Sequence, residues 1–152
     1  MFNDIRMKGE DMWKVDKILV PVDGSEFSFK AAHFSTSCAK QFNSEVIILH
    51  CHKPDFCYAN DKDYNAIHAR IEEKAEDMLD RFHEIYDKLK IKHWEIIPDP
   101  PAAQAIVEVA DREKVDIIMM GTHGRTDLQG LLLGSVTHKV LHLAHCPVLV
   151  IR

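Results

Sequence analysis

The chain alternates short, continuous apolar runs with longer stretches in which apolar residues recur at helical spacing. Apolar runs rich in Val, Ile and Leu, bounded by Gly, Pro or polar residues, are typical of buried strands. Five such runs are predicted to be strands, at residues 17–22, 45–51, 92–98, 115–120 and 148–151. The third contains His93 and Glu95, so we expect it to lie nearer an edge of the sheet.

Four helices are predicted between these strands, over residues 26–42, 63–90, 102–113 and 136–143. Ser25 is placed to cap the first, because a Ser side chain can accept a hydrogen bond from an N–H group of the first turn. The second helix carries an apolar stripe at alternating three- and four-residue steps, the pattern of a helix packed on a sheet. We interpret this stripe as core; it consists of Tyr64, Ile67, Ile71, Ala75, Met78, Phe82, Ile85 and Leu89.

Strands and helices therefore alternate along the whole chain, which predicts an α/β fold. Right-handed crossovers between successive strands give a five-stranded, mostly parallel, Rossmann-like sheet with helices on both faces. A chain of 152 residues is long enough for one domain with its own core. We expect that domain at residues 17–152, preceded by an N-terminal extension at residues 1–16.

A glycine-rich loop separates the fourth strand from the last helix, with the spacing Gly121-x2-Gly124-x9-Gly134-Ser135. The first N–H groups of a helix have no partner within the helix, and its dipole places positive charge there, so a strand, a glycine loop and a helix start together suit a phosphate group. The common phosphate-loop patterns G-x-x-x-x-G-K-[ST] and G-x-G-x-x-G after a strand are absent. The alternative is a plain connection, but such connections usually have only about 2–6 residues.

This spacing resembles the nucleotide-binding signature of the universal stress protein family, in its ATP-binding, single-domain branch. The opening residues 18–25, ILVPVDGS, and the closing residues 147–151, PVLVI, carry the same resemblance. It implies the strand order 3-2-1-4-5 and a homodimer in which the last strands, at residues 147–151, pair about a two-fold axis. It also implies a stress-response regulatory protein that binds ATP with Mg²⁺.

The resemblance also implies a set of binding residues at the ends of the strands and the start of the last helix. Pro21, Val22 and Asp23 line the adenosine side, Cys51 contacts the adenine, Met120 and Gly121 close the floor, and Gly124, Gly134, Ser135, Val136 and Thr137 hold the phosphates. Arg125 either reaches the γ-phosphate or is a solvated loop residue. Asp23 is a turn or capping residue on the simpler interpretation, but the edge of a central strand favours a ligand role.

The residues for catalysis remain unassigned, because phosphoryl transfer needs a held metal ion and a group that positions the nucleophile. Asp23 is the one acid predicted near the site, and His123 is a weaker candidate for a base. The competing function is therefore a slow ATPase or another enzyme that processes adenine nucleotides. An electron-transfer flavoprotein would fit the fold, but no feature of the sequence indicates a flavin.

The ten histidines raise the further alternative of a metal site, although no metal ligand is assigned. His50 and His52 would share one face of a strand, and His138 and His142 one face of a helix, but neither pair has a second pair at ligand spacing. Four cysteines without a C-x-x-C pair are expected to be free thiols.

Composition argues against two other classes of protein. The net charge of −5, with both signs interspersed, disfavours a nucleic-acid binder. No apolar run approaches the roughly 20 residues that span a bilayer, and the first residues do not form a signal peptide, so no membrane association is expected. We expect a cytoplasmic protein.

Overall fold

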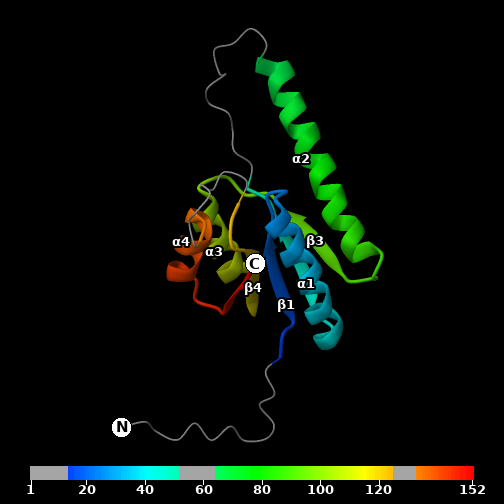
Figure 1. Cartoon of the computed structure of the whole chain (residues 1–152), viewed down its shortest axis with the longest axis vertical. Helices are drawn as coiled ribbons and strands as arrows, with labels where there is room; N and C mark the ends of the chain where they lie inside the picture. The colour runs from blue at the N-terminus through cyan, green and yellow to red at the C-terminus, as the bar shows by residue number, and fades with distance from the viewer. Residues whose placement is uncertain (1–13, 52–63, 125–132) are drawn as a thin grey trace, which may run out of the picture.

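The computed structural model describes residues 14–51, 64–124 and 133–152. Strands and helices alternate: β1 (Lys17–Pro21), α1 (Glu26–Phe42), β2 (Glu45–Leu49), α2 (Tyr64–Asp87), β3 (His93–Ile96), α3 (Ala102–Glu113), β4 (Ile117–Gly121), α4 (Ser135–Leu143) and β5 (Val148–Ile151). Figure 1 shows α1 and α2 on one side of the sheet and α3 and α4 on the other. The predicted α/β class is confirmed.

The five strands form one parallel sheet in the order β3-β2-β1-β4-β5, as the sequence resemblance implies. The central strand β1 pairs with β2 on one side and with β4 on the other, so Ile18 lies beside both Val46 and Ile117. The chain leaves β1 towards β2 first and returns to its other side only at β4. The switch point of the sheet therefore lies between β1 and β4.

Two apolar cores, one on each face of the sheet, hold the helices in place. Alternate residues of a strand point to opposite faces. Ile18 and Val20 belong to the core under α1 and α2, whereas Leu19 belongs to the core under α3 and α4. All three side chains are fully buried. A sheet buried on both faces explains why the strands were visible as continuous apolar runs.

The ends of several elements differ from those predicted, because local hydrogen bonds decide them. Ser25 caps α1 as predicted, with its Oγ accepting from Ser28 N at 3.2 Å. Helix α2 ends at Asp87 rather than at residue 90, because Lys90 adopts a left-handed φ of 55°. The N–H of Ile91 donates to the Tyr86 carbonyl at 3.0 Å, which closes the helix end.

The residues just before β1 contact the domain. Val15 is fully buried in the core, and its carbonyl accepts from Ser44 Oγ at 2.5 Å. The Asp116 carboxylate accepts from the backbone N–H groups of Asp16 and Lys17, at 2.7 and 2.8 Å. Residues 1–13 of the predicted extension lie outside the described part of the chain. Within that part, no helix combines the length and the hydropathy needed to cross a membrane.

Candidate functional site

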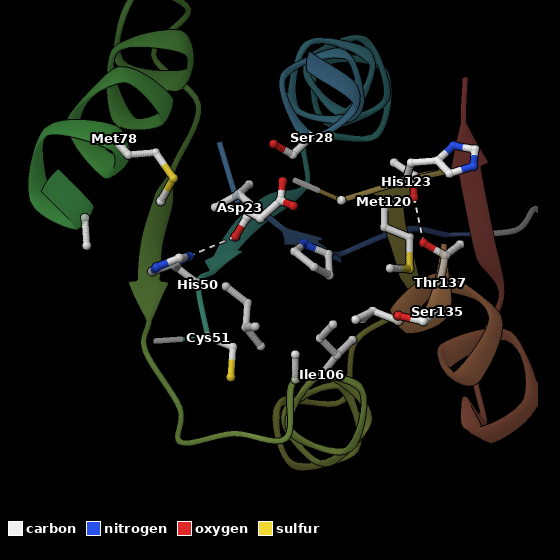
Figure 2. Close-up of a pocket in the computed structure, with 18 of the residues that line it drawn as sticks. Asp23, Ser28, His50, Cys51, Met78, Ile106, Met120, His123, Ser135 and Thr137 are labelled. Carbon is white, nitrogen blue, oxygen red and sulfur yellow. Dashed lines mark hydrogen bonds between the residues drawn. The ribbon is translucent and has the colours of Figure 1, made fainter. Parts of the chain in front are cut away.

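A cavity of about 600 Å³ lies at the carboxyl ends of β1, β2 and β4. Residues of all four helices contribute to its walls, and Figure 2 shows Asp23 near its middle, with His50 and Cys51 on one side and Ser135 and Thr137 on the other. The size is that of a typical small-molecule site. Its place at the switch point is where open parallel sheets bind ligands.

Most of the residues that the sequence predicts for a nucleotide site line this cavity. They are Pro21, Val22, Asp23, Cys51, Met120, Gly121, Gly124, Ser135, Val136 and Thr137. Gly134 is not a lining residue; it is the N-cap of α4, with φ −68° and ψ 156°, and its N–H donates to the Thr122 carbonyl at 2.7 Å. Arg125 lies outside the described residues.

The β1–α1 turn combines both interpretations of Asp23. Asp23 Oδ1 accepts from the Ser25 N–H at 3.0 Å, the bond of a turn-forming aspartate. The same residue lines the cavity. Gly24 has φ 77°, which a residue with a side chain rarely adopts. The turn at Gly24 lets α1 begin at Glu26, three residues after Asp23. A turn bond from one oxygen thus fixes the carboxylate at the cavity wall.

Gly121 is a glycine because of helix packing. It lies in a strand, and a Cβ placed on it would come within 2.6 Å of Phe27 Cβ and 2.8 Å of the Phe27 carbonyl carbon. The missing side chain therefore lets α1 approach β4, and the cavity lies beyond this contact. The sequence predicts that the glycine-rich loop suits a phosphate group; at Gly121 the group that approaches is the first turn of α1.

The Thr137 hydroxyl also has a structural partner. Thr137 is buried, and its Oγ1 donates to the Gly121 carbonyl at 2.9 Å (Figure 2). That bond ties the start of α4 to the end of β4, and it uses the hydroxyl hydrogen that we had expected to face a phosphate. The backbone N–H groups in the first turn of α4 are the donors that this end of the cavity offers.

His50 also lines the cavity, although the sequence raised it only as one of a His50–His52 metal pair and not as a nucleotide-binding residue. Its Nδ1 lies 3.0 Å from the Val22 carbonyl oxygen (Figure 2). A carbonyl oxygen only accepts, so Nδ1 carries the hydrogen. The bond joins the ends of β2 and β1 and fixes Cys51, the next residue, at the cavity. The available sequence signal was its position near the end of the predicted strand at residues 45–51.

Helix α2 forms a wall of the cavity that the sequence did not predict. Ile71, Ala75 and Met78 line the cavity together with Lys74. These three apolar residues are half-buried, unlike Phe82 further along the helix, which is fully buried. The prediction that the whole stripe is core is therefore wrong for Ile71 and Ala75, whereas Met78 lines the cavity and also packs against the core. Ala102 and Ile106 of α3 add further apolar surface.

The two ends of the cavity thus differ in chemistry. The end formed by α2, α3 and the end of β2 is largely apolar, which suits a flat aromatic ring. The end at β4 and α4 presents the backbone N–H groups of a helix start, which suit an anion. Among the described residues, no group of three or more His, Cys, Asp or Glu side chains is arranged to hold a metal ion. Within the same part of the chain, Cys38, Cys51 and Cys146 are free thiols, as expected.

A parallel sheet with helices on both faces defines a doubly wound α/β protein, and the cavity lies at the switch point where such sheets bind ligands. A sequence model of the universal stress protein family matches residues 14–152. The chain belongs to the universal stress protein family.

Relatives of known sequence and structure agree with this assignment. Universal stress protein MJ0531 of Methanocaldococcus jannaschii is 35% identical over 155 residues, which cover 100% of this chain and 89% of that protein. The solved structure of MJ0577, from the same organism, has a TM-score of 0.80 and 32% identity, covering 90% of this chain and 95% of that one. A universal stress protein from Archaeoglobus fulgidus in complex with dAMP shares the fold, with a TM-score of 0.66 and 21% identity over 93% of this chain and 100% of that one.

Proposed function

We propose that the protein is a stress-response regulator that binds ATP with Mg²⁺ in the cavity between the end of β1 and the start of α4. The observation that carries this proposal is the polarity of a single cavity: apolar walls from α2 and α3 at one end, and the N-terminus of α4 at the other. An adenosine group fits the first end and a phosphate chain the second. The dAMP bound to the Archaeoglobus fulgidus relative supports an adenine nucleotide as the ligand.

The regulatory role, as opposed to catalysis, is supported by the side chains that line the cavity. Asp23 is the sole carboxylate among the described lining residues, and its Oδ1 already accepts the turn bond from Ser25. Hydrolysis needs a metal ion held in place and an oriented nucleophile. We therefore expect occupancy of the site to be the signal, and a slow ATPase is the alternative that turnover measurements distinguish.

Gly134 offers a sharp test, because its backbone conformation suits an N-cap residue with a side chain. In Gly134→Asp the new carboxylate would accept from the first N–H groups of α4 and repel a phosphate, while helping the helix to form. Gly134→Asn is the matched control, since it has the same shape and capping ability without the charge. Calorimetry with Mg²⁺ should give at least about tenfold weaker ATP binding for Asp than for Asn, with equal adenosine binding.

Released phosphate would be assayed on the same samples. Saturable ATP binding by the unmodified protein without steady turnover agrees with the regulatory role, and turnover well above background would favour the enzyme. No binding at millimolar ATP would show the proposed site to be wrong.

A further inference from the structure

Helix α2 contacts the β1–α1 turn at a point next to the middle of the cavity. A Cβ placed on Gly24 would lie 2.8 Å from Met78 Sδ, so Met78 packs directly against the turn that carries Asp23. Figure 2 places Met78 and Ser135 on opposite sides of Asp23. Lys74 lies one helical turn before Met78, a rise of about 6 Å towards the N-terminus of α2. In Figure 1 that end of α2 extends beyond the sheet, and Lys74 is one of the α2 residues that line the cavity.

Lys74 carries the one permanent positive charge among the described residues that line the cavity. It is exposed, and within the described part of the chain no ion pair or hydrogen bond uses its ammonium group. Lys74 shares a helix face with Ile71 and Met78. A lysine can lay its aliphatic stem along such apolar neighbours and place its charge at the tip. Lys74 thus brings a positive charge to the cavity from the side of the apolar end.

We propose that Lys74 binds the ligand phosphate nearest the nucleoside, the α-phosphate, from the side opposite α4. This inference rests on the proposed nucleotide site and assigns it a residue that lies outside the glycine-rich motif. The proposed order of the ligand supports the α-phosphate, with the adenosine against α2 and α3 and the terminal phosphates at the start of α4. Lys74 lines the cavity one helical turn from Met78, which packs on the turn that carries Asp23 in the middle of the cavity. An ammonium group and a phosphate oxygen form a charge-assisted hydrogen bond.

The test compares Lys74→Ala and Lys74→Arg with Lys88→Ala by titration with adenosine, AMP and ATP. Lys88 is the matched control, because it is an exposed lysine of neighbouring sequence that pairs with Glu84 at 3.0 Å and does not line the cavity. Lys74→Ala should weaken AMP and ATP by the same factor, about tenfold, and leave adenosine unchanged. Lys74→Arg should restore most of the affinity, and Lys88→Ala should match the unmodified protein.

The outcomes separate this inference from the proposed function. Failure of the unmodified protein to bind AMP and ATP would overturn the nucleotide site itself. Normal binding by that protein, with Lys74→Ala equal to Lys88→Ala, would overturn only the role of Lys74. An equal loss for adenosine would show that Lys74 acts through the packing of α2. A loss that grows from AMP to ATP would assign Lys74 to the terminal phosphates and contradict the α-phosphate contact.

Discussion

Tyr86 is the largest fully buried side chain that carries a polar atom, and it joins α2 to α1. Its hydroxyl lies 2.9 Å from Ser35 Oγ and 3.5 Å from the Ala32 carbonyl oxygen. Burial raises the pKa of Tyr86 well above its ordinary value, and the hydrogen bond with Ser35 offsets only part of that rise. The folded protein therefore holds this proton at a pH at which an unfolded tyrosine releases it.

The sign of the pH effect follows directly. An unfolded tyrosine has a pKa of about 10, so the contribution of neutral Tyr86 to the free energy of unfolding is complete below about pH 10. It is lost as the pH rises above 10, by up to about 1.4 kcal/mol per pH unit. We expect Tyr86→Phe to remove this alkaline loss. Denaturant unfolding of both proteins from pH 8 to pH 11 would give the slope of the free energy of unfolding against pH for each. The difference between the two slopes measures the effect of Tyr86, because the contributions of other titrating groups cancel. Parallel slopes would mean that Tyr86 ionises equally well in the folded protein.

For single residues, the sequence predicted which residues line the cavity better than it predicted the groups that they contact. Asp23 was predictable because it directly follows an apolar run, whereas Cys51, at the end of one, was assigned through the family resemblance. The partners of Gly121 and Thr137 were not, because both depend on where α1 and α4 come to lie against β4. Lys74 was not predicted for the same reason: nothing in its neighbourhood along the chain marks it as a residue that lines the cavity.

The helices and strands were predicted well where apolar residues follow one regular pattern along the whole element. β1, β2, β4 and β5 are covered by continuous apolar runs, and α2 by its stripe. The strand order came from resemblance, since apolar periodicity does not say which strands are neighbours. The stripe of α2 could not reveal that Ile71, Ala75 and Met78 face a cavity, because an apolar side chain has the same periodicity whether a core or a ligand covers it.

Close contact between α1 and β4 gives a prediction at the scale of elements. In Gly121→Ala the added methyl would meet Phe27 Cβ and the Phe27 backbone at 2.6 to 3.0 Å, so helix α1 has to move away from the strand. Overpacking of this kind costs about 1–3 kcal/mol, and we expect that loss in the free energy of unfolding by denaturant titration. An unchanged midpoint would mean that α1 shifts on β4 without cost. Gly121→Ala should also lose ATP affinity, by less than it loses in the free energy of unfolding, because α1 begins at the Asp23 turn.

The feature of the whole molecule that bears on its assembly is the edge strand β5 of the sheet. The carbonyl groups of Pro147 and Ile151 accept from Ile118 and Thr122 of the β4 side, both at 2.9 Å. Backbone groups alternate in direction along a strand, so those of Val148 and Val150 point away from β4. An exposed, apolar edge of this kind invites pairing with another strand. This supports the proposed homodimer, in which two copies pair through β5.

The direction of the Val150 backbone permits a test that separates assembly from folding. Val150→Pro removes one N–H from the outer edge, where proline is tolerated, and leaves the bonds of Pro147 and Ile151 to the β4 side in place. We expect this variant to be a folded monomer by light scattering and circular dichroism, and the unmodified protein to be a dimer. Val150→Ala, which trims the side chain but keeps the N–H, should remain a dimer. A dimeric Val150→Pro protein would place the interface elsewhere, and loss of the dimer in both variants would assign it to side-chain packing instead of strand pairing.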